Sequence, residues 1–172
     1  CPTRYSFYVD GSGVNSLLIP AGGCRMPIEK GRTDVLEFDE DGNGRTKEDL
    51  YMNGMDIMIF AMREAPRLIK GIMSDVGWTN DDVDLFGLHQ ANKMMVSRIA
   101  KTLKADPDKV PVNMLHTGNC GFVSIPLMLC NTYEGVNKNF EKVVLCGFGA
   151  GLIAAAAAVD LSRTKMIKTI EV

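Results

Sequence analysis

A histidine and an asparagine follow a short apolar run, at a point where an α/β fold places ligand-binding side chains. The segment His89-Gln90-Ala91-Asn92 comes directly after the apolar residues 83–88 and before a segment with helical periodicity. At the carboxyl end of a strand, the His89 side chain would point into the ligand crevice of a layered fold. Asn92 would lie at a helix N-terminus, where free N–H groups attract anions. The alternative is structural: a hydrogen-bonded histidine at a strand end and an asparagine that caps the helix.

A second polar turn, residues 116–121, could place another neutral hydrogen-bond donor beside His89. Its sequence is His-Thr-Gly-Asn-Cys-Gly, and a further helical segment follows it. In a crevice, the amide of Asn119 and a ring N–H of His89 could both donate to one thioester carbonyl oxygen. Two such donors would stabilise an enolate as negative charge moves onto that oxygen. The alternative is that Asn119 and its glycine neighbours only satisfy the geometry of the turn.

The third candidate is the segment Gly-Phe-Gly-Ala-Gly at residues 147–151, which lies between two uncharged apolar runs. Small residues let the backbone approach a ligand, and the N–H groups of a turn can bind an oxyanion. We predict a tight turn between two strands here. Because a strand rather than a helix is expected to follow, the segment lacks the strand–turn–helix context of a dinucleotide-binding fingerprint.

The composition limits the kind of fold that can position these residues. The chain has 172 residues, of which 46% are hydrophobic and 23% charged, and its net charge is −2. These values are typical of one globular domain, or of one half of a larger domain. A slightly acidic chain lacks the excess of Lys and Arg that nucleic-acid binding needs. No apolar run reaches the roughly 18 residues of a membrane-spanning helix, so we expect neither a nucleic-acid nor a membrane partner.

Strand and helix patterns alternate along the chain, which predicts an α/β fold with buried strands. Strands are expected at residues 5–9, 17–19, 83–88, 142–146 and 152–161, and helices at 50–76, 92–104 and 124–133. Pro66 lies inside the first helical run and predicts a kink or two abutting helices. We treat residues 1–172 as a single unit, with a polar, irregular excursion at 27–49 and a tail at 162–172.

Together the three motifs resemble the second half of ketoacyl-acyl-carrier-protein synthase III, the initiating condensing enzyme of type II fatty-acid synthesis. The resemblance rests on the order His-Gln-Ala-Asn, Gly-Asn and Gly-Phe-Gly-x-Gly, and on the spacing of 30 residues from His89 to Asn119. Further matching segments are residues 8–13 (an Asp-Gly segment), 17–23 (a Leu-Pro-Gly-Gly segment) and 52–54 (Met-x-Gly). The implied fold class is α/β: a thiolase-like C-terminal half, in which a mixed, mostly buried sheet carries helices on both faces.

The resemblance implies a decarboxylative Claisen condensation in the cytoplasm. Malonyl-carrier protein would lose carbon dioxide, and the resulting carbanion would attack an acyl group held as a thioester on a cysteine. His89 and Asn119 would bind the malonyl thioester carbonyl and stabilise its enolate. Backbone N–H groups near Gly149 and Ala150 would supply an oxyanion donor. The other implied site residues are Asn92, Gly22 and Gly23 along a pantetheine tunnel and Phe148 at the floor of the site.

Substrates and partners follow from the same resemblance. Acyl-CoA and malonyl thioesters would be substrates, with no bound cofactor and no metal. The protein partners would be an acyl carrier protein and a second copy of the parent protein in a homodimer. Lys93, Lys101 and Lys104 lie on one face of the helix expected at 92–104, with Arg98 beside them, and could attract the acidic carrier protein. The alternative is an ordinary solvated face.

The nucleophilic cysteine of the family lies in its first half, at the N-terminus of a buried helix that lowers the thiol pKa. None of the five cysteines here has that context: Cys1, Cys24, Cys120, Cys130 and Cys146. We interpret Cys130 and Cys146 as buried packing residues. The chain is therefore expected to hold half of an active site, to be inactive alone and to come from a longer enzyme. The odd count and irregular spacing favour free thiols in a reducing cytosol over a disulfide framework.

Two other interpretations of the function stay open. Elongating synthases of the superfamily use two histidines, so Asn119 indicates either the type III enzymes or the polyketide- and chalcone-synthase-like branch. Three departures from the family pattern leave the substrate open: Met94 stands where an arginine is common, Ala150 replaces a glycine, and Cys-Gly-Phe-Val-Ser at 120–124 replaces a run of small residues. The second interpretation is a non-catalytic scaffold or interaction half, although scaffolding would require neither His89 nor Asn119.

Two metal-binding patterns are incomplete. Residues 39–44 read Asp-Glu-Asp-Gly-Asn-Gly like the start of an EF-hand loop, but Leu50 stands where the loop needs a bidentate glutamate. His116 and Cys120 are four residues apart, and no second pair of zinc ligands follows them. We expect a solvated loop at 39–44, with neither calcium nor zinc bound.

Overall fold

A four-stranded mixed sheet organises the computed structural model, which describes residues 3–136 and 138–170. Its strand order is β1-β8-β7-β6, with β1 at Arg4–Val9, β6 at Leu85–Leu88, β7 at Val143–Gly149 and β8 at Ile153–Val159. β8 pairs antiparallel with both β1 and β7, whereas β6 and β7 are parallel, with Leu88 opposite Cys146. The carboxyl ends of β6 and β7 therefore meet at one edge of the sheet.

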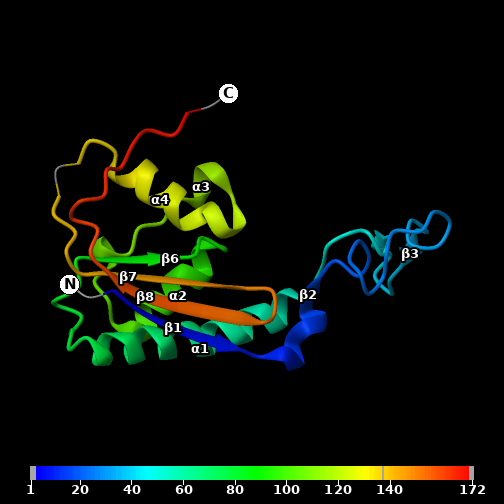
Figure 1. Ribbon diagram of the computed structural model, residues 1–172, viewed down its shortest axis with the longest axis horizontal. Coiled ribbons are helices and arrows are strands. Elements are labelled where there is room, and N and C mark those ends of the chain that lie inside the picture. The colour runs from blue at the N-terminus through cyan, green and yellow to red at the C-terminus, as the bar shows by residue number, and fades with distance from the viewer. Residues whose placement is uncertain (1–2, 137, 171–172) are drawn as a thin grey trace.

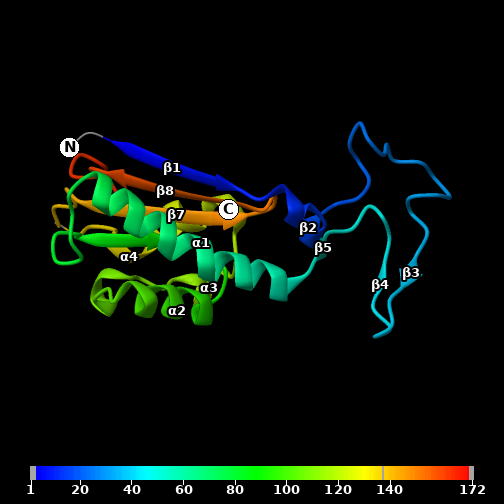
Figure 2. The same cartoon turned by 90° about the horizontal axis from the view of Figure 1, so that it is seen from below.

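Helices cover both faces of this sheet, as Figures 1 and 2 show, so the predicted α/β fold class is confirmed. On one face lie α1 (Gly54–Asp75) and α2 (Lys93–Leu103), and on the other lie α3 (Met114–Thr117) and α4 (Ser124–Tyr133). The larger core lies under α1 and α2, with Ile69, Phe86 and Ile99 among its buried members. A smaller core under α4 is built around Met128 and Val143. The sheet is thus held between two apolar layers.

The alanine-rich strand β8 runs through the middle of the sheet. Its residues alternate between the two faces, and Ala154, Ala156 and Ala158 are buried in the larger core beneath α1. A β-strand exposes successive side chains on opposite faces, so short alanine side chains at these three positions let α1 lie close to the sheet. This packing accounts for a strand made of a residue type that is a weak strand former.

Helix α1 differs from its sequence prediction in two ways. It is one continuous 22-residue helix through Pro66, not two abutting helices. Proline removes one intrahelical hydrogen bond, but Pro66 is itself buried, and the packed residues of the following turns hold the helix together. The helix also starts later than residue 50. β5 (Tyr51–Met52) pairs with β2 (Leu17–Leu18), and the Asn53 side chain then caps the helix.

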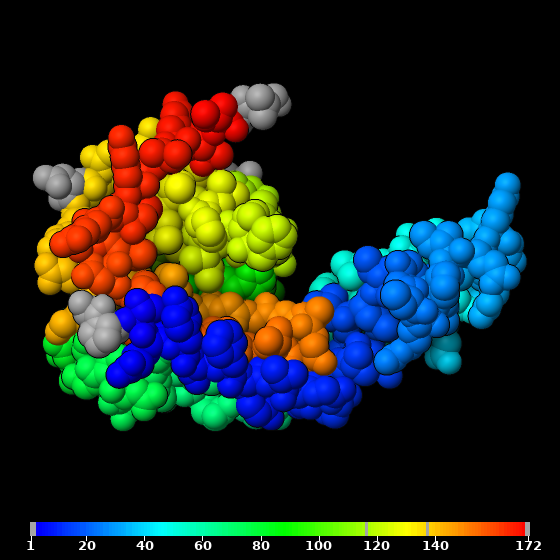
Figure 3. All heavy atoms as spheres, in the orientation of Figure 1, coloured from blue at the N-terminus to red at the C-terminus, as the bar shows by residue number. Residues whose placement is uncertain are grey.

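Residues 19–50 form an arm that projects away from the body of the molecule (Figures 1 and 3). A 3-10 helix at Gly11–Ser16 precedes the arm. Within the arm, β3 (Glu37–Phe38) pairs antiparallel with β4 (Gly44–Arg45). The predicted excursion at residues 27–49 lies within this arm. Two short 3-10 helices, Pro107–Lys109 and Gly121–Val123, complete the elements. Among the described residues, no helix is both long and apolar enough to cross a lipid bilayer.

Candidate active site

His89 and Asn119 line the same cavity, which has a volume of about 790 Å³. It opens at the edge of the sheet where β6 and β7 end. Figure 3 shows the surface hollowed between the α3–α4 region and the arm, with the turn between β7 and β8 at the bottom of the hollow. Its full lining is Leu17, Leu50, Met52, His89, Asn119, Gly121, Phe122, Ser124, Ile125, Gly147, Phe148, Gly149, Ala150, Ile153 and Ala155. The mostly apolar wall thus carries a few polar groups, as in small-molecule sites.

His89 directly follows β6, and its backbone N–H donates to the Cys146 carbonyl at 2.8 Å, which extends the pairing with β7 by one residue. Its side chain is half-buried, and Nδ1 lies 2.7 Å from the Ser124 Oγ. Burial lowers the pKa of His89 below its ordinary value, because the charged imidazolium loses hydration. The ring is therefore neutral at pH 7, and one of its nitrogens is a hydrogen-bond donor.

Asn119 lies in the turn after α3, between Gly118 and the 3-10 helix. Gly118 has φ of 68°, a left-handed conformation that favours glycine and ends α3. The Asn119 Oδ1 accepts a hydrogen bond from the Gly121 N–H at 3.0 Å. That contact fixes the orientation of the carboxamide, and no described residue hydrogen-bonds its Nδ2 group. Asn119 therefore presents N–H donors from the rim of the cavity.

The Gly-Phe-Gly-Ala-Gly segment forms the end of β7 and only part of a turn, which corrects the predicted turn at 147–151. Pairing with β8 continues as far as Gly149 opposite Ile153, so residues 150–152 alone make the connection. A Cβ atom placed on Gly147 or Gly149 would meet no other atom within 4 Å. The absence of side chains at these two positions thus leaves room in the cavity beside Phe148.

Three predicted binding residues do not line this cavity. The Asn92 Oδ1 accepts a hydrogen bond from the Met95 N–H at 2.8 Å, which is the structural role of a helix cap. Gly22 and Gly23 lie in the arm, where the Gly22 N–H donates to the Met26 carbonyl at 2.9 Å. Gly22 has φ of 112°, which explains a glycine at that position without a ligand.

Sequence reasoning missed two buried polar residues next to the site, Gln90 and Ser124. The Gln90 side chain donates to the carbonyls of Leu88 and Pro111 and accepts from the Asn113 N–H, so it ties the end of β6 to the segment before α3. Gln90 could have been suspected, because a polar side chain next to a strand end needs partners. For Ser124 the sequence holds no signal beyond its place at a helix start.

None of the four described cysteines lines the cavity. Cys146 is buried, as predicted, and burial raises the pKa of its thiol to about 12. Cys130, on α4, is only half-buried, so its prediction as a buried packing residue is only partly right. Cys120 is half-buried and Cys24 exposed, and all four are free thiols. Cys1 lies outside the described residues.

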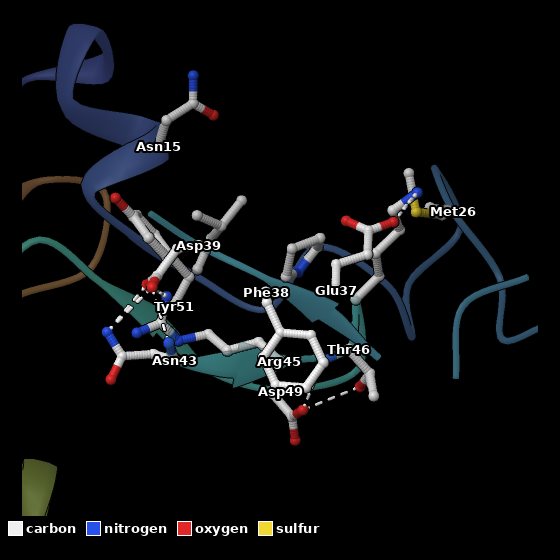
Figure 4. A pocket seen from close by; sticks show the side chains of 13 residues that line it. Asn15, Met26, Glu37, Phe38, Asp39, Asn43, Arg45, Thr46, Asp49 and Tyr51 are labelled. Carbon is white, nitrogen blue, oxygen red and sulfur yellow. Dashed lines mark hydrogen bonds and ion pairs between the residues drawn. The ribbon is translucent and has the colours of Figure 1, made fainter. Parts of the chain in front are cut away.

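The EF-hand-like segment in the arm is a hairpin connection. The Asp39 carboxylate accepts hydrogen bonds from the backbone and side chain of Asn43 and lies 3.5 Å from the Arg45 guanidinium, as Figure 4 shows. These residues border a second cavity of about 510 Å³, which is lined mainly by residues of the arm and by neither His89 nor Asn119. Within residues 3–136 and 138–170, no three His, Cys, Asp or Glu side chains are grouped to hold a metal ion. The His116 side chain lies outside the described structure.

Residues 73–161 match the sequence profile of a protein family, the C-terminal region of 3-oxoacyl-[acyl-carrier-protein] synthase III. The chain belongs to this family. The match runs from the end of α1 through β8, and so includes His89, Asn119 and the end of β7. The motif-based resemblance is thereby confirmed.

Relatives and solved structures of synthase III agree with this assignment. The chain is 34% identical over 149 residues to the beta-ketoacyl-[acyl-carrier-protein] synthase III of Rhodopirellula baltica, and 39% identical over 146 residues to that of Streptococcus gordonii. These alignments cover 86% and 83% of this chain, but only 40% and 41% of the relatives. The chain thus spans about two fifths of the length of the curated relatives it matches.

The fold is shared with crystal structures of the same enzymes. A 3-oxoacyl-(acyl-carrier-protein) synthase III superposes with a TM-score of 0.83 at 34% identity, over 91% of this chain and 47% of that one. The 3-oxoacyl-(acyl-carrier protein) synthase of Burkholderia xenovorans gives 0.84 at 29% identity, over 99% and 47%. The predicted thiolase-like half is therefore confirmed as the fold of this synthase III region.

Proposed function

We propose that this chain provides the His–Asn half of the active site of a 3-oxoacyl-acyl-carrier-protein synthase III-type condensing enzyme of fatty-acid biosynthesis. The reaction joins an acyl thioester to malonyl-carrier protein with loss of carbon dioxide. The observation that carries the proposal is the meeting of His89 and Asn119 in one cavity. Two elements 30 residues apart in sequence thus bring two neutral N–H donors to the same apolar space.

The two donors suit the first chemical step. When the carbon–carbon bond to the malonyl carboxylate breaks, its electron pair moves toward the thioester carbonyl and carbon dioxide leaves. The carbonyl oxygen then carries the negative charge of an enolate, which His89 and Asn119 would stabilise by hydrogen bonds. A neutral imidazole is the suitable donor, and burial favours that form of His89. In an apolar cavity these hydrogen bonds gain strength from the exclusion of water.

The second step is attack of the enolate carbon on an acyl thioester, with release of the thiolate. The backbone at Gly149 and Ala150 borders the cavity and would supply an N–H donor for the new oxyanion. Phe148, which lines the cavity, would form the floor of the site. The acyl-bearing cysteine would come from a part of the enzyme other than the described residues, because none of Cys24, Cys120, Cys130 and Cys146 lines the cavity.

The acyl carrier protein is the proposed macromolecular partner, and α2 the proposed docking element. Lys93, Arg98 and Lys101 on α2, with Lys104 at its C-terminal cap, are all exposed, and the helix has no acidic residue. Such a face would attract an acidic partner. Reversing the charge at Lys101 and Lys104 should raise KM for malonyl-carrier protein without lowering kcat. Lys70→Glu, an exposed charge reversal on α1, is the control, and an unchanged KM in the double variant would remove α2 from the docking surface.

A second copy of the enzyme or its remaining half would cover the outer strand of the sheet. Tyr5, Phe7 and Val9 on β1 are between 62% and 66% exposed, which is unusual for three apolar residues in a row on one strand face. We propose a homodimeric parent enzyme in the cytoplasm, a location compatible with an exposed free thiol at Cys24.

Coenzyme A thioesters would be substrates, and the reaction needs no resident cofactor.

The test is turnover by the enzyme that contains this chain together with the acyl-accepting cysteine. Acyl-coenzyme A and malonyl-carrier protein are supplied, and 3-oxoacyl-carrier protein is detected by mass spectrometry. Product should form in the unaltered enzyme and fall sharply in His89→Ala and Asn119→Ala, but not in Asn139→Ala, which alters an exposed asparagine. Product from malonyl-coenzyme A only would favour the polyketide-synthase-like branch. Folded enzyme without any product would favour a scaffold.

A further inference from the structure

Ser124, the first residue of α4, contacts the imidazole of His89 through its hydroxyl group. Ser124 is only 3% exposed, although it lines the cavity, and its Oγ lies 2.7 Å from the His89 Nδ1. The same oxygen accepts a hydrogen bond from the Gln90 backbone N–H at 3.3 Å. The hydroxyl thus lies between two consecutive residues that follow β6.

The hydrogen-bond pattern determines where the protons lie. A serine hydroxyl has one proton to donate and two lone pairs. One lone pair of Ser124 is used by the Gln90 N–H, and no described carbonyl or carboxylate accepts from the hydroxyl. The acceptor within reach is the His89 Nδ1. With Nδ1 as the acceptor, a neutral ring carries its proton on Nε2.

We propose that Ser124 is a positioning residue that holds His89 as the Nε2–H tautomer, with that N–H available to the cavity. The tautomer itself does not depend on the proposed function. Its catalytic use does: in the proposed reaction, the Nε2–H group donates to the enolate oxygen. No described residue hydrogen-bonds the His89 Nε2, which leaves it free for a substrate. The contact between the ring and Phe148, with centroids 5.1 Å apart, restrains the remaining rotation.

The opposite tautomer is disfavoured by burial. If His89 carried its proton on Nδ1 and donated to Ser124, the serine hydroxyl would have to donate elsewhere. Ser124 is only 3% exposed, and no described residue other than His89 offers its hydroxyl an acceptor. A buried hydroxyl without an acceptor loses the hydrogen bond that it makes to water in the unfolded chain.

Nitrogen NMR of this chain tests the proposal without any enzyme assay. The sequence has only two histidines, so His116→Gln leaves His89 as the single imidazole. In ¹⁵N-histidine-labelled protein at pH 7.5, the two-bond correlations of the ring protons identify which nitrogen carries the proton. We expect Nε2 to be protonated and Nδ1 to be the bare nitrogen. A proton on Nδ1 in this otherwise unaltered protein would overturn the proposal.

Variants then separate positioning from mere packing. Ser124→Ala should mix the two tautomers and raise the pKa of His89, because the neutral ring loses the hydrogen bond that stabilises it. Ser124→Thr keeps a hydroxyl and should restore the Nε2–H signal, whereas Ser74→Ala, an exposed serine on α1, should leave it unchanged. An unmixed Nε2–H signal in a folded Ser124→Ala protein would contradict the role of the hydroxyl.

The consequence for catalysis is measured separately, in the active enzyme. Ser124→Ala should lower kcat by about 10- to 100-fold with little change in KM, and Ser124→Thr should recover most of the loss. If the tautomer is Nε2–H but the enzyme has no condensing activity, the proposed function fails and the positioning role stands. If the enzyme is active and the proton is on Nδ1, the positioning role fails alone.

Discussion

The imidazole of His89 packs against the edge of Phe148, with ring centroids 5.1 Å apart and ring planes at 86°. The two residues come from adjacent parallel strands: His89 follows β6, and Phe148 lies near the end of β7. Both line the cavity, so the aromatic contact sets how far the imidazole projects into it. This contact connects the fold of the sheet edge directly to the geometry of the site.

Removing the Phe148 ring should lower the stability of the fold. Phe148 is half-buried and packs against the larger core, so Phe148→Ala should lower the free energy of unfolding by about 2 kcal/mol, less than a fully buried phenylalanine would lose. Urea denaturation measures the change. Phe122→Ala is the matched control, because Phe122 is 95% exposed and should shift stability by less than about 0.5 kcal/mol. Equal losses in both variants would show that Phe148 does not pack as described.

Stability should depend on pH through His89. Burial places the pKa of His89 in the folded chain below the ordinary value of 6.5. As the pH falls below about 6.5, the unfolded chain takes up this proton first, so the free energy of unfolding decreases until the folded pKa is passed. Above about pH 8, His89 is neutral in both the folded and the unfolded chain, and its contribution to the free energy of unfolding no longer changes with pH.

The His89→Gln variant lacks this titration. The difference in unfolding free energy between the unaltered chain and His89→Gln, measured by urea denaturation at several pH values, should therefore shrink as the pH is lowered from 7.5 toward 5. The comparison cancels the titration of the surface carboxylates, which both proteins share. If this difference in unfolding free energy grew as the pH fell, the folded chain would favour the charged imidazolium. That result would contradict the neutral His89 that the proposed reaction uses.

Much of the fold could be predicted because the strongest patterns are local. α4 was expected at 124–133 and lies there, and α2 starts and ends within one residue of its predicted range. Motif spacing predicted that His89 and Asn119 share one crevice, and both residues line the cavity; their chemical roles remain a prediction. The role of Ser124 depends on α4 lying across the end of β6, a tertiary relationship that no local spacing encodes. Likewise, Pro66 suggested a break that tertiary packing overrides.

The Gln90 side chain should be as important for stability as any core residue nearby. It is 1% exposed and makes three hydrogen bonds, to Leu88, Pro111 and Asn113. Gln90→Leu would remove all three of these hydrogen bonds from buried or partly buried backbone groups and should cost about 2 to 3 kcal/mol. Chemical denaturation would measure the loss, with the exposed Asn139→Leu as the control. A loss below about 0.5 kcal/mol would show that the segment before α3 does not depend on this side chain.

In the proposed reaction, His89 and Asn119 act together on one carbonyl oxygen during decarboxylation. This step can be measured without the acyl thioester substrate. Carbon dioxide release from malonyl-carrier protein is measured for the complete enzyme and for His89→Ala, Asn119→Ala and the double variant. Each single variant should lose about 10²- to 10³-fold in rate, and the double variant much less than the product of the two losses. Losses that multiply, or one variant that decarboxylates at the unaltered rate, would contradict the account.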